Sequence, residues 1–489
     1  GGMGGGGTTA QLSLATANRA AVECEYAVRG EIVQRAGELS AALQAGGPEA
    51  EALPFAKVVQ CNIGNPQSLG QQPVTFFRQV LALCDWPGLA DALGEGQRAF
   101  PADALARARE LQRGIAGGTG AYSHSQGVAV CREAVARAVA RRDGHACDPA
   151  DLFLTDGASQ GVHLCMRVML RGQQDAVLTP IPQYPLYSAC LRLYGGSLAP
   201  YYLDEGNGWA LSVQELQRAL EAARAQGQEV RALAVINPGN PTGQVLSEEN
   251  QREVVKFCQR EGLALLADEV YQDNVYAEGK RFCSFKKVVR DLQADDVPTF
   301  SFHSISKGFY GECGRRGGYM EMVNVSPEIK QLFYKLSSIN LCSNLNGQIC
   351  TALMMEPPRE GDESFPLYAQ ERDAILASLK RRAKTLTAAL RSMEGVTCNE
   401  PEGALYVFPQ ITLPEKACEA ARAAGKAPDA FYCMRLLEAT GVVVVPGSGF
   451  GQKEGTWHFR TTFLPSESDI GDVCPRLTQF HADFLAQYK

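Results

Sequence analysis

Short apolar runs alternate with amphipathic segments through the middle of the chain. The runs that predict strands are 151–155, 175–181, 231–237, 263–269 and 298–302. Helical spacing follows at 162–170, 212–225 and 247–261. Ser212 and Glu215 predict a capping box at the start of the second helix, and Gly262 ends the third. Because these strands are apolar throughout and alternate with helices, they indicate an α/β fold with a mainly parallel sheet flanked by helices.

The pattern changes at the Pro- and acid-rich stretch 356–366. A long amphipathic helix is expected after it, with apolar residues up to Met393 and an end at Gly395. Short strand-like runs and a last helix follow, which indicates a smaller α+β domain. We therefore expect a flexible tail or expression remnant (1–20), an N-terminal arm with part of the small domain (21–120), a large domain (121–360) and a C-terminal small domain (361–489).

Composition excludes several kinds of protein. A net charge of −7 argues against nucleic acid or an anionic membrane as a partner. No apolar run reaches the roughly 18 residues of a membrane-spanning helix. The sixteen cysteines contain no C-x-x-C pair, and the six histidines show no metal-ligand spacing, so no metal site is expected. This pattern predicts reduced thiols in a soluble intracellular enzyme of the cytoplasm or mitochondrial matrix, with any targeting peptide absent from this sequence.

Polar residues recur where the predicted strands end. DGASQG follows DLFLT, NPGNPTG follows LAVI, DEVY follows LALLA and HSISK follows PTFSF. In open α/β sheets, ligands bind beyond the carboxyl ends of the strands. The sequence therefore predicts a site at this edge of the sheet.

Two short motifs at this edge have alternative interpretations. Residues 157–161 fit a G-x-S-x-G nucleophile elbow, and Ser159, Asp268 and His458 follow the chain order of a serine hydrolase triad. The same strand–turn–helix equally predicts an anion cradle at Ala158 and Ser159. Residues 447–452 resemble a dinucleotide fingerprint, but Gln452 replaces its last glycine.

One chemistry uses all the polar residues of this edge together. Pyridoxal 5'-phosphate requires a lysine that forms a Schiff base, an acid for its ring nitrogen and a phosphate site. Lys307 and Asp268 match the first two requirements, while Tyr271 and Asn240 are candidates for its ring hydroxyl. The candidates for the phosphate are Ser159, Ser304 and Arg316, since the arginine fork suits a phosphate.

At this point the chain resembles the fold-type I aminotransferases, in particular their alanine branch. The motifs are NPGNPTG, DEVY, SISKGFYGECGRRGG and WHFRTTFLP, with FFRQVLALC, GAYSHSQG and LYVFPQI typical of that branch. The resemblance covers roughly residues 20 to 489. It implies a Schiff-base role for Lys307 and a ring-nitrogen partner in Asp268, with Asn240 and Tyr271 at the ring hydroxyl and Tyr184 stacked on the ring.

The resemblance also implies the remaining contacts. Ala158, Ser159, Ser304 and Arg316 match phosphate contacts, and Arg316 is favoured over its neighbour Arg315. Arg460 matches the clamp for the substrate α-carboxylate, near the backbone of Gly64. Tyr122 matches a tyrosine that reaches the phosphate of the neighbouring subunit, which implies a homodimer.

The implied reaction is reversible amino transfer between L-alanine and 2-oxoglutarate, giving pyruvate and L-glutamate. A glutamate–glyoxylate aminotransferase of the same family is the main alternative. More distant alternatives are a C–S lyase with the same cofactor and a serine hydrolase that uses the GASQG motif.

Overall fold

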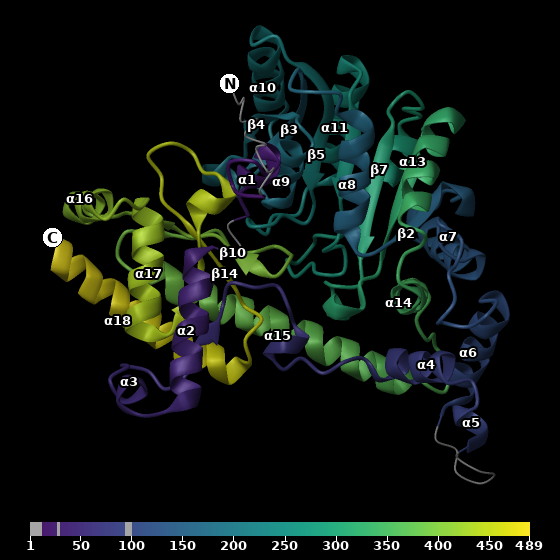
Figure 1. Ribbon diagram of the computed structural model, residues 1–489, viewed down its shortest axis with the longest axis horizontal. Helices are drawn as coiled ribbons and strands as arrows, with labels where there is room; N and C mark the ends of the chain where they lie inside the picture. Colours follow the sequence, from purple (N-terminus) through teal and green to yellow (C-terminus); the bar gives the residue numbers. More distant parts are fainter. Residues whose placement is uncertain (1–11, 27–29, 93–99) are drawn as a thin grey trace, which may run out of the picture.

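The computed structural model describes residues 12–26, 30–92 and 100–489. Its centre is a seven-stranded sheet in the order β2-β8-β7-β6-β5-β3-β4 (Figure 1). The strands are β2 (Leu152–Thr155), β3 (Asp175–Ile181), β4 (Ser197–Tyr202), β5 (Glu229–Ile236), β6 (Ala264–Asp268), β7 (Thr299–Ser304) and β8 (Gly318–Val323). Strands β4, β3, β5, β6 and β7 are parallel, whereas β8 is antiparallel to both β7 and β2. The predicted α/β class with a mainly parallel sheet is confirmed.

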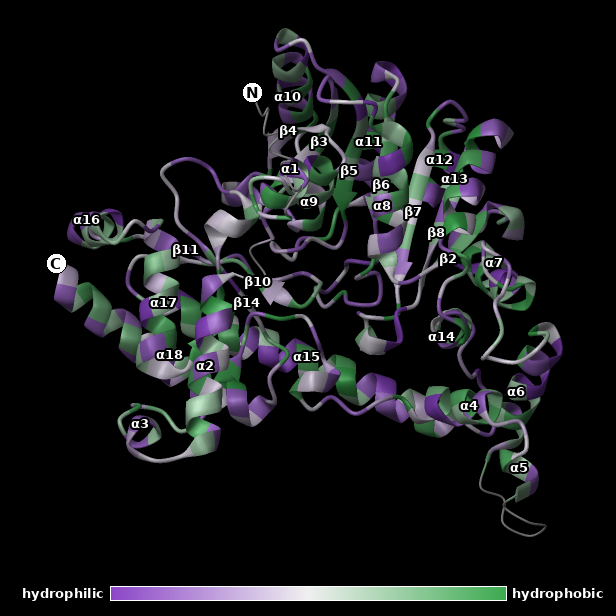
Figure 2. Ribbon diagram, in the orientation of Figure 1, coloured by the Kyte–Doolittle hydropathy of each residue, from purple (hydrophilic) through white to green (hydrophobic). Residues whose placement is uncertain are grey.

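Helices cover both faces of this sheet, as Figures 1 and 2 show. The flanking helices are α7 (Ala129–Asp143), α8 (Ala158–Met169), α9 (Leu186–Leu193), α10 (Val213–Ala225), α11 (Glu248–Glu261), α12 (Phe285–Asp291), α13 (Pro327–Ile339) and α14 (Leu345–Met355). Adjacent strand residues pack into opposite layers: Leu265 joins the core under α10 and α11, and Leu266 joins the core under α8 and α9. Because both faces are buried, the strands have no polar side to alternate with.

The predicted helix ends are correct in part. The Ser212 side chain accepts a hydrogen bond from the Glu215 N–H at the start of α10, and Gly262 ends α11 in the left-handed conformation. The Glu215 carboxylate, however, accepts from the Tyr202 N–H at 2.9 Å, so the second half of the predicted capping box is wrong. A neighbouring strand end offers Glu215 a donor that the local sequence does not contain.

The remaining elements lie beyond the carboxyl ends of the central strands. The N-terminal strand β1 (Val59–Gln60) pairs with β12 (Val442–Val443) of the C-terminal part. The long helix α15 (Phe365–Arg391) begins near α4 and runs toward the C-terminal strands (Figure 1). This helix ends at Arg391, so the predicted extension to Met393 is wrong, although Met393 is buried. An exception is α1 (Arg19–Val22), which packs on α9 beside the sheet. The other elements of this part are α2 (Glu31–Ala45), α3 (Pro48–Glu51), α4 (Thr75–Asp85), α5 (Leu89–Ala92), α6 (Ala102–Gly114), β9 (Val396–Thr397), β10 (Tyr406–Val407), β11 (Gln410–Ile411), α16 (Glu415–Ala423), α17 (Pro428–Thr440), β13 (Val445–Pro446), β14 (Phe459–Thr462) and α18 (Glu467–Tyr488).

Within the described ranges, no helix has the length and hydropathy needed to cross a membrane. The same residues contain no group of three or more His, Cys, Asp or Glu side chains placed to hold a metal ion. All sixteen cysteines lie in the described part of the chain; none forms a disulfide, and most are buried.

Candidate active site

A cavity of about 420 Å³ opens at the carboxyl ends of β6 and β7 and the first turn of α8. It gathers side chains or backbone from segments that are far apart in the sequence. The predicted site residues that line it are Gly64, Ala158, Ser159, Tyr184, Asn240, Asp268, Tyr271, Ser304, Lys307, Arg316 and Arg460.

The cavity distinguishes Arg316 from Arg315, and it does not include Tyr122. Arg316 lines it, whereas Arg315 does not and forms an ion pair with Glu312 at 3.4 Å. Tyr122 lies outside the cavity of its own chain, in the loop between α6 and α7, and is 79% exposed.

Lys307 lies in the turn that follows β7, and its Nζ donates a hydrogen bond to the Gly64 carbonyl at 2.7 Å. A Cβ at Gly64 would lie 1.9 Å from the Tyr406 hydroxyl and 2.8 Å from the Lys307 Nζ. Glycine is therefore required there, because only a bare backbone leaves room for both groups.

Asp268 is the last residue of β6, and 5% of it is exposed. Its Oδ2 accepts a hydrogen bond from the Tyr187 hydroxyl at 3.1 Å, while its Oδ1 is buried without a hydrogen-bond partner. Burial raises the pKa of Asp268 to about 6, although the Tyr187 hydroxyl, the Val270 backbone and the charge of Lys307 oppose the shift. A cationic N–H donor in the cavity would satisfy this oxygen and stabilise the carboxylate.

The opposite end of the cavity has the properties of a phosphate site. Gly157, with a φ of 78°, turns the chain from β2 into α8, so that the helix begins at Ala158 and Ser159. The Arg316 guanidinium is held there by hydrogen bonds to the carbonyls of Asp156 (2.8 Å) and Cys313 (3.1 Å). Free N–H groups at a helix start, a hydroxyl and a fixed guanidinium together favour a phosphate.

Arg460 occupies the third part of the cavity and is only 2% exposed. Its Nη1 donates to the Asn240 Oδ1 at 3.2 Å, its Nη2 donates to the Asn62 carbonyl, and its Nε has no partner. The guanidinium carbon lies 4.2 Å from the centre of the Tyr406 ring and 4.7 Å from that of Phe450. A buried arginine with a free N–H and no carboxylate partner among these contacts is suited to binding a substrate carboxylate.

A chain of hydrogen bonds links this arginine to the ring-hydroxyl candidates. The Asn240 amide donates to the Tyr271 hydroxyl at 3.4 Å, which in turn donates to the Tyr406 hydroxyl at 3.3 Å. Burial by itself would raise the pKa of Tyr406, but the charges of Lys307 and Arg460 outweigh it and lower that pKa below its ordinary value.

Sequence reasoning missed three tyrosines of this site. Tyr406 and Tyr26 line the cavity, and Tyr187 supports Asp268 from behind. Tyr406 belongs to the motif LYVFPQI, and Tyr187 lies three residues after the predicted site residue Tyr184, so both had a signal in the sequence. Tyr26 has no motif that points to it.

The hydrolase alternative is wrong in its geometry. The two ring nitrogens of His458 lie 3.0 Å from Gln452 Oε1 and 3.0 Å from Glu205 Oε2, and His458 does not line the cavity. Asp268 is instead bonded to a tyrosine. Ser159, Asp268 and His458 therefore do not form a triad.

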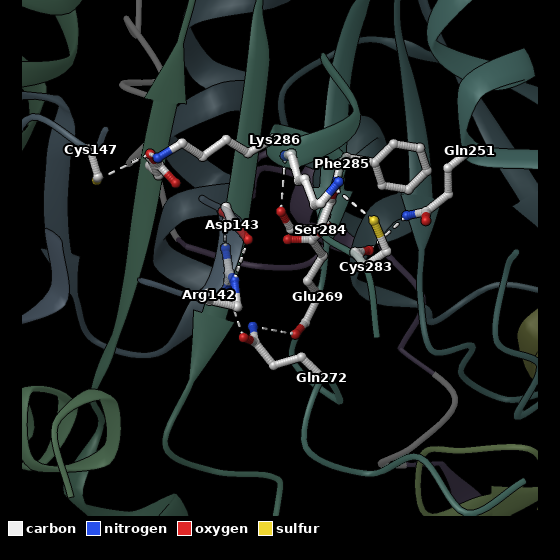
Figure 3. A network of polar contacts seen from close by, with 12 residues as sticks. Arg142, Asp143, Cys147, Gln251, Glu269, Gln272, Cys283, Ser284, Phe285 and Lys286 are labelled. Atoms are coloured by element: carbon white, nitrogen blue, oxygen red, sulfur yellow. Dashed lines mark hydrogen bonds and ion pairs between the residues drawn. The ribbon is translucent and has the colours of Figure 1, made fainter. Parts of the chain in front are cut away.

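A second polar network lies behind the site (Figure 3). Glu269 follows Asp268 but points to the other side of the sheet, where its Oε1 accepts from the Phe285 N–H at 2.7 Å. Arg142 donates to Gln272 at 2.7 Å, and Gln272 donates to the Glu269 carbonyl at 3.1 Å. Burial raises the pKa of Glu269 to about 8, although Arg142 opposes the shift. The network therefore fixes the residue that directly follows Asp268.

These groups fit pyridoxal 5'-phosphate. Asp268 has an unpaired buried oxygen for the protonated ring nitrogen, and Lys307 offers an amine in the same cavity. Arg316 and the start of α8 suit the phosphate, while Tyr271 and Asn240 are placed for the ring hydroxyl.

Comparison with known proteins agrees with this arrangement. The family model "Aminotransferase class I and II" matches residues 91–477. Alanine aminotransferase 2 of Panicum miliaceum is 56% identical over 483 residues, which cover 98% of this chain and 99% of that protein. Glutamate–glyoxylate aminotransferase 2 of Arabidopsis thaliana is 49% identical over 480 residues, covering 98% and 97%.

Solved structures show the same fold. An alanine aminotransferase from Pyrococcus furiosus has a TM-score of 0.72 at 24% identity, covering 96% of this chain and 100% of that one. The family model spans most of the chain, and full-length relatives exceed half identity. This chain therefore belongs to the class I and II aminotransferases, enzymes that use pyridoxal 5'-phosphate to transfer amino groups between small molecules.

Proposed function

We propose that this enzyme catalyses reversible amino transfer between L-alanine and 2-oxoglutarate, giving pyruvate and L-glutamate. The observation that carries the proposal is the cavity in which Lys307, Asp268 and Arg460 face a common space. Relatives named alanine aminotransferase, 56% identical over nearly the full chain, support the choice of alanine.

Each polar residue has a proposed task. When bound, pyridoxal 5'-phosphate supplies a carbonyl that takes up amino groups and a ring that withdraws electrons from the substrate α-carbon. Asp268 keeps the ring nitrogen protonated, and Tyr271 and Asn240 bind the ring hydroxyl. The Nζ of Lys307 removes the proton from the α-carbon of the amino acid as a general base and later returns it as an acid.

The other residues hold the substrate and cofactor in place. Arg460 binds the α-carboxylate that amino acids and oxo acids share, beside the backbone of Gly64. Ala158, Ser159, Ser304 and Arg316 bind the phosphate, and Tyr184 stacks on the ring. Such fixed positioning lowers the barrier by reducing the entropy that must be lost in the transition state.

Glutamate–glyoxylate transfer is the second candidate, favoured by the 49% identical relatives with that name. Comparing kcat/KM for pyruvate and glyoxylate, with L-glutamate as donor, separates the two. We expect pyruvate to be preferred. A tenfold or greater preference for glyoxylate would replace alanine in the proposed function and leave the residue roles in place.

We also propose a homodimer in which Tyr122 reaches the phosphate site of the other subunit. Its exposure supports this, as do the exposed Ile339 and Leu341 nearby, since the Ser125 hydroxyl donates to the Leu341 carbonyl at 2.7 Å. Light scattering measures the mass in solution. A monomeric active enzyme would contradict the proposal.

Two further proposals concern organisation and location. Residues 121–360 form the cofactor-binding domain. Residues 21–120 and 361–489 form the smaller part, which the pairing of β1 with β12 supports.

The cysteines without disulfides support a cytoplasmic or mitochondrial location. Limited proteolysis tests the domain boundaries, and imaging of a tagged protein tests the location.

A further inference from the structure

Two tyrosine hydroxyls from distant segments meet at the edge of the cavity. The hydroxyl of Tyr26 lies 2.7 Å from that of Tyr184, and their rings are 6.4 Å apart in an edge-to-face arrangement. Both tyrosines line the cavity, and Tyr26 is 36% exposed, which places it at the mouth.

The segment that carries Tyr26 is fastened to α9, the helix that begins just after Tyr184. Helix α1 packs on α9, and Glu23 forms an ion pair with Arg192. The Cys24 thiol also approaches the Ala189 carbonyl at 3.7 Å. The Tyr26 hydroxyl is therefore held in place by contacts outside the cavity.

Each cationic side chain of the cavity already has a proposed partner. Among the described residues, the cationic side chains that line the cavity are Lys307, Arg316 and Arg460. Under the proposed function these meet the amino group, the phosphate and the α-carboxylate, which are common to both half-reactions. L-Glutamate and 2-oxoglutarate carry a second carboxylate where alanine has a methyl group, and burying that carboxylate without a donor would be costly.

We propose that the hydroxyls of Tyr26 and Tyr184 form the subsite for the side-chain carboxylate of the dicarboxylic substrate. This inference rests on the proposed function. With alanine bound, the hydroxyls bond to each other, so that the methyl group leaves no polar atom without a partner. With glutamate or 2-oxoglutarate bound, each hydroxyl turns its O–H toward one carboxylate oxygen. A neutral, self-satisfying pair accepts both side chains, whereas a fixed cation would be left unpaired by alanine.

The surroundings of Tyr184 support this role. Burial, and then the neighbouring Tyr26, raise the pKa of Tyr184 well above its ordinary value, so that its hydroxyl keeps its proton at neutral pH. Arg460 opposes that shift, which means that the hydroxyl lies within electrostatic reach of the proposed α-carboxylate site. The two ends of one small dicarboxylate are thus provided with donors.

The first test is Tyr26→Phe, which removes one hydroxyl and keeps the ring. We expect kcat/KM for 2-oxoglutarate to fall about tenfold or more relative to that for pyruvate, because a hydrogen bond to a charged group is lost. Tyr202→Phe is the matched control, since Tyr202 is similarly exposed at 38% and lies outside the cavity. An unchanged ratio in Tyr26→Phe would overturn the inference.

The second test measures binding without turnover. Calorimetry on the purified, cofactor-loaded enzyme compares glutarate, which has two carboxylates, with butyrate, which has one. We expect glutarate to bind at least about tenfold more tightly, and both Tyr26→Phe and Tyr184→Phe to lose most of this advantage. Asn65 also lines the cavity and is the alternative donor to the second carboxylate. Loss of the advantage in Asn65→Ala but not in Tyr26→Phe would overturn the inference.

These measurements separate the inference from the function on which it rests. An enzyme that prefers glyoxylate to pyruvate contradicts the alanine proposal, yet it still uses glutamate, and the glutarate comparison still decides whether the hydroxyl pair binds its carboxylate. An alanine enzyme in which glutarate has no advantage over butyrate contradicts the inference alone.

Discussion

The guanidinium of Arg460 lies over the ring of Tyr406, with 4.2 Å between the guanidinium carbon and the ring centre. The two residues belong to neighbouring strands, β14 and β10, which are paired antiparallel. The ring therefore restricts the plane of a buried cation whose other contacts are the ring of Phe450, the side chain of Asn240 and a backbone carbonyl.

Replacing this ring should weaken the carboxylate site. In Tyr406→Leu, the loss of a desolvated cation–π contact worth about 2 kcal/mol should lower kcat/KM by roughly thirtyfold for amino acids and oxo acids alike. Tyr406→Phe keeps the ring and should lose only about threefold. Steady-state kinetics of both half-reactions measure the effects, and equal losses in the two variants would mean that the hydroxyl, and not the ring, supports Arg460.

Asp268→Asn should stabilise the cofactor-free protein while lowering its activity. The folded-state pKa of about 6 lies above the ordinary aspartate value of 3.8. The folded protein therefore binds more protons than the unfolded chain between these values, and its stability falls as pH rises through that window. The variant removes this penalty, which is about 3 kcal/mol above pH 6. Urea unfolding at pH 7.5 should show the gain, which should disappear below pH 4.

The activity of the same variant should fall by roughly 10²–10³, because the charge proposed to face the ring nitrogen is lost. Asp483→Asn, at an exposed position of α18, is the control for both measurements. A variant that is no more stable at pH 7.5, or one that keeps full activity, would contradict the assigned environment of Asp268.

Gly157→Ala should weaken cofactor binding. A Cβ at this position would lie 2.5 Å from the Arg316 Nη2, and the φ of 78° disfavours any side chain. Displacement of the guanidinium should raise the dissociation constant of pyridoxal 5'-phosphate about tenfold or more. Gly144→Ala, also at a positive φ of 73° but with open space around it, is the control. Similar cofactor affinity in both variants would show that Arg316 does not hold the phosphate.

Lys307→Ala should abolish turnover, since in the proposed mechanism the amine both attaches the cofactor and moves the proton of the substrate. Equilibrium dialysis should still detect cofactor binding through the Arg316 and Asp268 ends of the cavity. Lys380→Ala, at an exposed position of α15, is the control for expression and folding. Turnover near that of the unaltered enzyme would contradict the central assignment.

Several features of the site follow from local sequence alone. Strand runs that are apolar throughout predict a buried parallel sheet, and parallel strands bring their carboxyl ends to one edge. The residues at or just after the ends of those strands, such as Asp268 and Lys307, therefore meet in the cavity as predicted. The caps at Ser212 and Gly262 are equally local, because each bond or turn involves only a few neighbouring residues.

Other features depend on contacts between segments that are far apart in the chain. Arg460 lies in the run WHFRTTF (457–463), where alternation puts it on the more polar face, a position compatible with either solvent or a cleft. Only the packing of β14 against β10 and Phe450 buries it. Tyr26 reaches Tyr184 across 158 positions, and no spacing rule connects them. Sequence determines which chemical groups follow each strand, while tertiary packing decides which hydroxyls and rings enclose them, because desolvation and hydrogen bonding depend on neighbours in space.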